Sequence, residues 1–184
     1  MKLFSYFTFF LLCFSFCSAD VVDKATGESF PSQVSFGDYT LDATGVSTRK
    51  KLMFKIYSVA SYLQENGDKS GDKFQQIMNP ENAKQLTLIW VRDVNAAKVQ
   101  DGFKNSLMSN SAPVADADKF VAFFSDVTKG DEHVLRWTPG GTIDVLINGS
   151  KAGSIENEEF AKSLWSIWFG NKSVVKRDQL VSLL

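Results

Sequence analysis

The sequence predicts an α+β fold in which helices cover one face of a large antiparallel sheet. Strand-like segments come first, helical segments follow in the middle, strands return between residues 133 and 155, and helices end the chain. A doubly wound parallel sheet would need strands and helices to alternate one by one, and that alternation is missing. At 184 residues with 44% hydrophobic positions, the chain suits one folded domain with a substantial core.

Residues 1–19 are predicted to be a cleaved secretory signal peptide. Lys2 gives a positive start, residues 3–16 are almost wholly apolar, and small residues follow, so cleavage is expected after Ala19. A membrane anchor is the alternative, but the apolar run is shorter than the roughly 18 to 20 residues that a spanning helix needs. The remaining chain, residues 20–184, is expected to be a single domain exported to a periplasm or out of the cell.

Both cysteines of the chain, Cys13 and Cys17, lie within this predicted signal peptide. Cleavage would therefore leave no cysteine for a disulfide framework, a nucleophile or a thiolate metal site. The single histidine, His133, excludes a histidine-rich metal cluster and is interpreted as a residue at the start of a strand. No nucleotide-binding or nucleophile-elbow motif occurs, and no cofactor is expected.

Three strands are predicted in the first half of the chain. Segments 36–41 and 52–63 alternate apolar and polar residues and are rich in β-branched and aromatic side chains, with a break expected near 42–45. After Pro80, segment 85–92 is a short apolar run between turn signals, which indicates another strand.

Helical periodicity follows. Val99, Phe103 and Leu107 recur every four residues and form the apolar stripe of a helix over 95–108, with Asn95 as its N-terminal cap. A second helix is predicted over 116–127. A third covers 156–170, and a short last helix covers 176–184. The apolar face of the third helix comprises Phe160, Leu164 and Ile167 or Trp168, and Gly170 is expected to end that helix.

Between these helices, segment 133–155 predicts a three-stranded meander. Gly140-Gly141 and Asn148-Gly149 each lie between β-rich runs, and residues that accept positive φ are what tight hairpin turns require. Asn148 and Asn171 also begin N-glycosylation patterns, which are short enough to match by chance, so the sequence leaves glycosylation open.

The segment 47–63 carries the candidate functional residues. Counting alternate positions along one strand, the even-numbered residues from Leu52 to Tyr62 form a core face. The other face carries cations, Arg49 among them, together with Tyr57 and apolar side chains. Such a face suits a pocket for an amphipathic anion, because arginine is a forked donor to carboxylates and tyrosine is a second donor. A half-exposed sheet face with lysines reaching water is the alternative, which the pattern alone favours.

Four blocks of sequence resemble successive blocks of the chalcone isomerase-like family. They are 45–63, 84–94, 130–155 and 158–174, and the match extends in the right order from about Thr26 to the end of the chain. The resemblance implies an open-faced sandwich, a large antiparallel sheet covered by helices. It also implies a ligand cleft between the sheet and the helices.

The same resemblance separates catalysis from binding. The family's true isomerases, which close a chalcone to a flavanone, are similar to this chain at Arg49, but their catalytic threonine falls on Tyr57. Their tyrosine falls near Asn95, their asparagine near Gly102, and their last hydroxyl residue on Ile167. The hydroxyl and water network that polarises the substrate ketone would be lost, so chalcone cyclisation is not expected.

The family's non-catalytic relatives that bind fatty acids are similar to this chain at both Arg49 and Tyr57. This similarity implies a carboxylate clamp, with a tail tunnel lined by residues such as Phe103, Phe120, Leu164 and Trp168. Eight steps of straight strand would hold Arg49 and Tyr57 about 26 Å apart, so a bulge or turn around residues 49–52 is required.

Three hypotheses therefore remain. The leading one is an exported non-catalytic protein that binds a fatty acid or a similar amphipathic anion through Arg49 and Tyr57. The second is an isomerase or lyase on an unknown substrate, and the third is a structural or partner-binding envelope protein. A formal net charge of -1 with scattered basic residues gives the whole chain no electrostatic footprint for nucleic acid or for an anionic membrane surface. No stable membrane insertion is expected after cleavage, and the sequence leaves the ligand's identity, the type of organism and the oligomeric state open.

Overall fold

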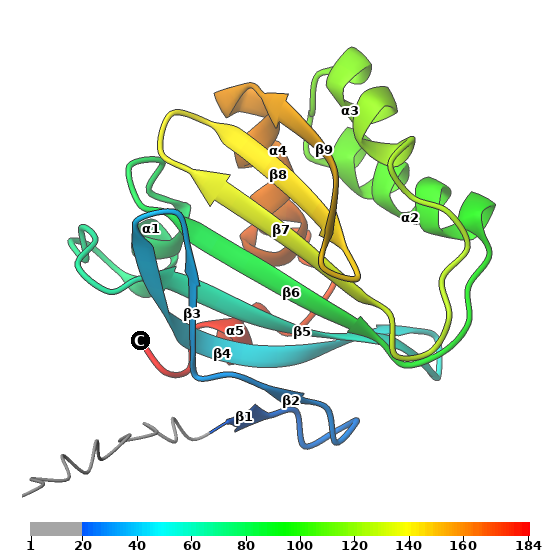
Figure 1. Ribbon diagram of the computed structural model, residues 1–184, viewed down its shortest axis with the longest axis horizontal. Coiled ribbons are helices and arrows are strands. Elements are labelled where there is room, and N and C mark those ends of the chain that lie inside the picture. The colour runs from blue at the N-terminus through cyan, green and yellow to red at the C-terminus, as the bar shows by residue number, and fades with distance from the viewer. Residues whose placement is uncertain (1–19) are drawn as a thin grey trace, which may run out of the picture.

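A computed structural model describes residues 20–184, so the predicted signal peptide lies outside the described residues. A seven-stranded antiparallel sheet dominates the described chain, and its strands follow one another in sequence order (Figure 1). A separate two-stranded sheet is formed by β1 (Val21–Val22) and β2 (Ser29–Phe30). The strands of the large sheet are β3 (Gln33–Phe36), β4 (Tyr39–Lys51), β5 (Phe54–Gln64), β6 (Lys84–Trp90), β7 (Glu132–Thr138), β8 (Thr142–Ile147) and β9 (Ser150–Glu156).

Helices cover one face of this sheet, with α4 behind β7 and β8 and with α2 and α3 beside it (Figure 1). The predicted α+β class is therefore confirmed. None of the helices within residues 20–184 is long and apolar enough to cross a membrane. The helices are α1 (Lys73–Met78), α2 (Ala96–Ser109), α3 (Val114–Val121), α4 (Glu158–Phe169) and α5 (Arg177–Leu180).

Both faces of the central strands are buried, so the prediction of a single core face, formed by even-numbered residues, is incomplete. The helix-covered face holds the main core, and the odd-numbered Tyr57, Val59 and Leu63 belong to it. Of the even-numbered residues expected to form the core, Leu52 is 92% exposed. Others, such as Tyr62, pack in a smaller cluster on the opposite face with Phe30, Leu41 and Ala60. A period of two separates the two faces of a strand, but it does not say which face the helices cover.

The first long hairpin also departs from the predicted boundaries. β4 runs without a break through residues 42–45, where the sequence predicts a separation, and the chain turns instead at Leu52 and Met53. Gly45 lies at an irregularity in the β4–β5 pairing and adopts φ 152°, a conformation that favours glycine. The strand thus bends at 42–45 instead of ending there.

The bend at Gly45 receives the C-terminal segment. The Thr44 hydroxyl donates a hydrogen bond of 2.7 Å to the Leu180 carbonyl, and the Leu183 amide donates one of 2.9 Å to the Thr44 carbonyl. A Cβ atom on Gly45 would collide with the Gln179 carbonyl oxygen and would lie 2.8 Å from the Leu180 carbonyl carbon. α5 therefore packs against β4 only because residue 45 has no side chain.

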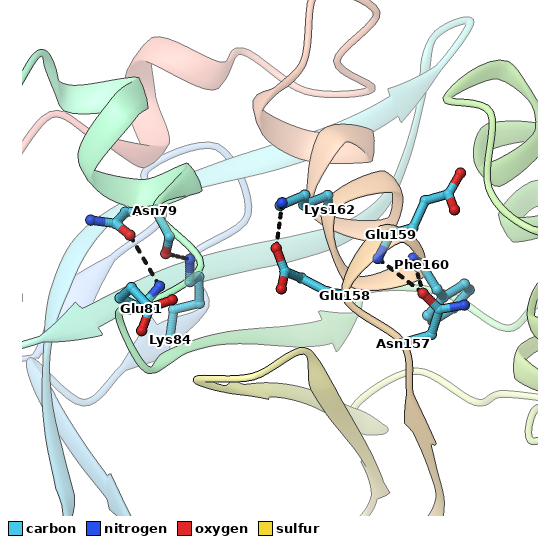
Figure 2. Close-up of polar contacts among 8 residues, drawn as sticks. All are labelled: Asn79, Glu81, Lys84, Asn157, Glu158, Glu159, Phe160 and Lys162. Carbon is cyan, nitrogen blue, oxygen red and sulfur yellow. Dashed lines mark hydrogen bonds and ion pairs between the residues drawn. The ribbon is translucent and has the colours of Figure 1, made fainter.

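The predicted helix signals are mostly confirmed. The Asn95 side chain caps α2 by accepting from the Lys98 amide. Asn157 caps α4 in the same way, accepting from the amides of Glu159 and Phe160 (Figure 2). The helix predicted over 116–127 is wrong at its end: α3 stops at Val121, and the chain then turns so that Val127 can pair with residue 94.

A buried lysine joins α1 to the sheet. The Lys84 ammonium donates to the carbonyls of Ile77 and Asn79 at the end of α1, and the Asn79 contact is drawn in Figure 2. It also lies 4.1 Å from the centre of the Trp137 ring. Burial lowers the pKa of Lys84 to about 7, because the charged form is poorly solvated there.

Substitution of Gly45 by alanine should destabilise the fold by about 2 to 3 kcal/mol, because the added methyl group overpacks the contact with α5 and its φ disfavours L-residues. Urea unfolding followed by circular dichroism would measure the change. Gly102→Ala is the matched control, because Gly102 lies inside α2 with open space around it. That substitution should raise stability by about 0.5 to 1 kcal/mol. Equal midpoints for Gly45→Ala and the parent protein would contradict the role assigned to Gly45.

Candidate ligand-binding site

A cleft of about 860 Å³ lies between the sheet and α2, at the end of the sheet where β6 leads into the helix. Its volume is within the range usual for small-molecule sites. Tyr57 and Trp90 of β5 and β6 line it on the sheet side, and Val99 and Phe103 line it on the α2 side. The other lining residues include Arg49, Lys51, Leu52, Phe54, Ile56, Arg92, Asp93, Val94, Asn95, Lys98, Gly102, Asp126, Val127 and Ile167.

The β4–β5 hairpin places Arg49 directly opposite Tyr57. The turn at Leu52 and Met53 reverses the chain, and the two residues become register partners on neighbouring strands. The Arg49 guanidinium carbon lies 5.9 Å from the centre of the Tyr57 ring. The turn required by the sequence analysis therefore exists, and the expected separation of 26 Å does not apply.

Tyr57 is held in place by a tryptophan from α4. The indole N–H of Trp168 donates a hydrogen bond of 3.1 Å to the Tyr57 hydroxyl oxygen. Burial raises the pKa of Tyr57 above its ordinary value, and the positive charge of Arg49 and hydrogen bonds from Trp168 and Arg49 only partly oppose this effect. The phenol is therefore neutral at pH 7. Because its oxygen accepts from the Trp168 N–H, its own proton is available to an acceptor in the cleft.

Beneath Tyr57, a second aromatic pair supports the cleft. The Trp90 ring packs edge-on against Tyr57, with centroids 5.4 Å apart, and its N–H donates a hydrogen bond of 3.1 Å to Nδ1 of His133. Burial lowers the pKa of His133 to about 4, although the nearby carboxylate of Asp131 opposes the shift. His133 is the second residue of β7, in agreement with its predicted place at a strand start.

Comparison with known proteins supports the resemblance found in the sequence. The family model described as chalcone isomerase-like matches residues 22–180. The chain belongs to the chalcone isomerase-like family. A crystal structure of a fatty-acid binding protein from Arabidopsis thaliana has the same fold, with a TM-score of 0.73, 21% sequence identity, and coverage of 89% of this chain and 96% of the plant protein. A search of curated protein sequences found no match.

The cleft of this chalcone isomerase-like protein contains every position that the resemblance assigned to the isomerases' site. Arg49 and Tyr57 line it from the hairpin, Asn95 and Gly102 from the start and middle of α2, and Ile167 from α4. These five positions are distant in sequence and meet only in the fold. Apart from Arg49, none carries the residue type that the isomerases use.

The predicted tail tunnel is only partly present. Phe103 lines the cleft, whereas Phe120, Leu164 and Trp168 are fully buried in the main core and do not line it. The Phe103 ring stacks on Phe124, with centroids 4.8 Å apart, and the rings behind it fill the space that a deeper tunnel would need. Helical periodicity identified these residues as inward-facing, but it could not distinguish a lining residue from a packed one.

The two sides of the opening differ in net charge, because carboxylates outnumber the one cation, Lys98, among the lining residues on the α2 side. Lys51 and Arg92 are on the hairpin and β6 side, and Arg92 lies over the Phe54 ring at 4.8 Å. Asp93 and Asp126 are on the side of α2, where their carboxylates accept from the backbone amides of Lys129 and Ala96. Arg92 and Trp90 were not predicted from the sequence as site residues. The only feature of the sequence that could have indicated them is their position at the end of a predicted buried strand.

The stability of the protein should fall as pH is lowered from about 7 to about 4.5, by on the order of 2 kcal/mol through His133 alone. In this pH window His133 of the unfolded chain, with an ordinary pKa near 6.5, becomes protonated, whereas the buried His133 of the folded protein stays neutral. The unfolded state therefore gains protons first, and acid favours it. Chemical unfolding at several pH values would measure the slope.

His133→Gln is the control for this prediction, because glutamine can still accept from Trp90 but does not titrate. The variant should lose most of the slope between about pH 6.5 and about pH 4.5. The same slope in both proteins would show that other groups cause it.

Proposed function

We propose that this protein is a non-catalytic binding protein for a fatty acid or a similar amphipathic carboxylate. The observation that carries the proposal is the pairing of Arg49 with Tyr57 on neighbouring strands, both lining one cleft of about 860 Å³. A cationic fork and a neutral phenol side by side suit a carboxylate, whose oxygens accept hydrogen bonds from both.

The charge state of both clamp residues suits this role. Within residues 20–184, Arg49 forms no ion pair with a carboxylate, so its charge is not neutralised inside the protein. Tyr57 is kept protonated by burial and oriented by Trp168. A bound carboxylate would supply the missing anion and would accept the Tyr57 proton as a hydrogen bond.

The remaining lining suits an alkyl chain of limited length. Ile56, Trp90, Val99, Phe103 and Ile167 present apolar surface from four different elements of the fold. Burial of apolar ligand surface against such a lining supplies affinity of about 25 cal/mol per Å² before the costs of association. Packed rings behind Phe103 favour a tail that stays in the cleft over one that enters the core.

The alternatives are less well supported. The resemblance implies that an isomerase of the chalcone type would have a threonine at position 57, a tyrosine near 95, an asparagine near 102 and a hydroxyl residue at 167, whereas this chain has Tyr57, Asn95, Gly102 and Ile167. A purely structural envelope protein, whose cleft is filled by its own side chains, does not explain an open cleft beside Tyr57. The fatty-acid binding plant protein of the same fold adds support to the binding proposal.

Arg49→Ala should weaken binding of decanoate at least tenfold, because it removes charge-assisted hydrogen bonds worth about 1.5 to 3 kcal/mol. Binding of 1-decanol, which has the same chain without the carboxylate, should change less than threefold. Isothermal titration calorimetry on both ligands would measure the difference. Tyr57→Phe should weaken decanoate binding by about threefold to tenfold.

Lys50→Ala is the matched control for the clamp, because Lys50 is adjacent and exposed but does not line the cleft. Its affinity for decanoate should remain within twofold of the parent protein. If decanoate bound Arg49→Ala and the parent protein equally well, the clamp would be excluded.

We further propose that the protein is exported and that its mature chain begins at Asp20. Native mass spectrometry of protein produced from the full-length gene should give the mass of residues 20–184 plus that of a co-purified fatty acid. Denaturation before the measurement should remove the extra mass and leave the protein mass unchanged. The mass of the full chain in the purified protein would contradict cleavage, and a ligand without a carboxylate would contradict the proposed ligand class.

A further inference from the structure

The hairpin that carries Arg49 ends in an exposed apolar tip. Residues 49–55 read Arg-Lys-Lys-Leu-Met-Phe-Lys, and we call this segment the tip hairpin. Leu52 is 92% exposed, Met53 is 85% exposed and Phe54 is 52% exposed. Three consecutive apolar side chains exposed to water indicate a surface that interacts with another apolar surface.

Cations surround this apolar tip and have no acidic partner in the described chain. The tip hairpin contains Arg49, Lys50, Lys51 and Lys55 and no acidic residue. None of these residues forms an ion pair within residues 20–184. Lys55 donates to the carbonyl of Ala25, which leaves its charge uncompensated. A local charge of this size attracts an anionic surface even though the whole chain has a net charge of only -1.

The turn itself is not the one that stability would select. Leu52 adopts φ 56°, in the left-handed region where a leucine is disfavoured. Glycine in place of Leu52 would accept this conformation without strain and would remove part of the apolar tip. The sequence therefore keeps an exposed leucine in a strained conformation, beside an exposed Met53, where a more stable and more soluble alternative exists.

The tip hairpin also forms part of the opening of the cleft. Lys51, Leu52 and Phe54 line the cleft together with Arg49. Figure 1 shows the β4–β5 turn at the end of the sheet where β6 leads to α2, which is the end that contains the cleft. Any surface that covers the tip therefore meets the entrance of the ligand site.

We propose that the tip hairpin docks the protein onto a lipid bilayer that contains anionic headgroups. Leu52, Met53 and Phe54 enter the interface, and the flanking cations lie at the level of the phosphates. Docking then places the cleft against the bilayer, so that an amphipathic ligand passes between the two without crossing water. This transfer role rests on the proposed function, whereas the docking itself does not.

A bilayer fits this surface better than a protein groove does. The apolar residues are at the end of the turn and the cations are behind them. A membrane has the matching arrangement, with an apolar interior beneath charged headgroups. On the α2 side of the opening, Asp93, Asp101 and Asp126 outnumber Lys98, so the net repulsion there by an anionic surface favours an approach through the hairpin side. Three apolar side chains and a few cations support a reversible association, not insertion.

Sedimentation with sucrose-loaded vesicles would test the docking. The protein as purified from cells that express the full chain should bind vesicles of phosphatidylcholine with about 30% phosphatidylglycerol at least tenfold more tightly than pure phosphatidylcholine vesicles. Binding should weaken as salt is raised from about 0.05 M to about 0.5 M, because salt screens the attraction. Absence of binding to the anionic vesicles would overturn the proposal.

Two substitutions outside the cleft lining separate the tip from the ligand site. Met53→Asp and Lys50→Gln should each reduce binding to the anionic vesicles at least threefold, and together at least tenfold. Matched changes distant from the cleft, Val114→Asp at the start of α3 and Lys172→Gln after α4, should reduce it less than twofold. Equal vesicle binding by the double variant and the parent protein would exclude the tip hairpin as the docking element. Binding of the parent protein to a protein partner, without binding to vesicles, would also contradict docking onto a bilayer.

Failure of docking and failure of ligand binding give different results. The Met53→Asp, Lys50→Gln double variant should retain decanoate affinity in the absence of vesicles, because neither residue lines the cleft. Tyr57→Phe should show the reverse, with weakened decanoate binding and unchanged vesicle binding.

The emission of a fluorophore attached to Met53→Cys should shift to the blue on binding anionic vesicles, whereas the emission of one attached to Val114→Cys should not. A shift at both positions, or at neither, would contradict docking through the tip.

Discussion

The candidate site depends on one irregularity in the pairing of β4 with β5. Near the turn, Lys51 pairs with Phe54 and Lys50 with Lys55, but the next pair is Arg49 with Tyr57, so Ile56 has no partner on β4. In a regular ladder Arg49 would face Ile56, and Tyr57 would lie on the other side of the sheet. The extra residue therefore brings the guanidinium and the phenol to the same face.

A second irregularity limits this shift to the middle of the hairpin. Ala43 pairs with Tyr62 and Gly45 pairs with Ser61, which leaves Thr44 as the extra residue on β4. The two bulges lie on opposite strands, so the register returns to its original value and the far end of the hairpin is unaffected. Thr44 uses its displaced position to bind the C-terminal segment. One bulge thus shapes the candidate site and the other anchors the end of the chain.

Much of the architecture was predictable from the sequence because its signals are local. The Gly-Gly and Asn-Gly turns of the β7–β9 meander, the Asn95 cap and the stripe of α2 all correspond to observed elements. The turn at Leu52 and Met53 carries no such signal, because neither residue is glycine or asparagine and the alternating pattern continues through it. Only the resemblance to a family with Arg49 and Tyr57 in one cleft required a turn there.

The site was harder to predict because its residues depend on distant contacts. Whether Tyr57 faces a helix-covered core or a second cluster is decided by Trp168, more than a hundred positions later in the chain. Trp90 and Arg92 contribute to the cleft through the position of α2, which strand periodicity does not report. The predicted role of Phe120, Leu164 and Trp168 failed for the same reason, since the packing among them decides where empty space remains.

Phe103 lies at the inner end of the cleft. Its ring is the boundary between the space available to a ligand and the aromatic cluster of Phe120 and Phe124 behind it. A shorter side chain at this one position would move that boundary inward without altering the sheet, the hairpin or the clamp. Under the proposed function, the ring of Phe103 would therefore limit the length of a bound alkyl chain.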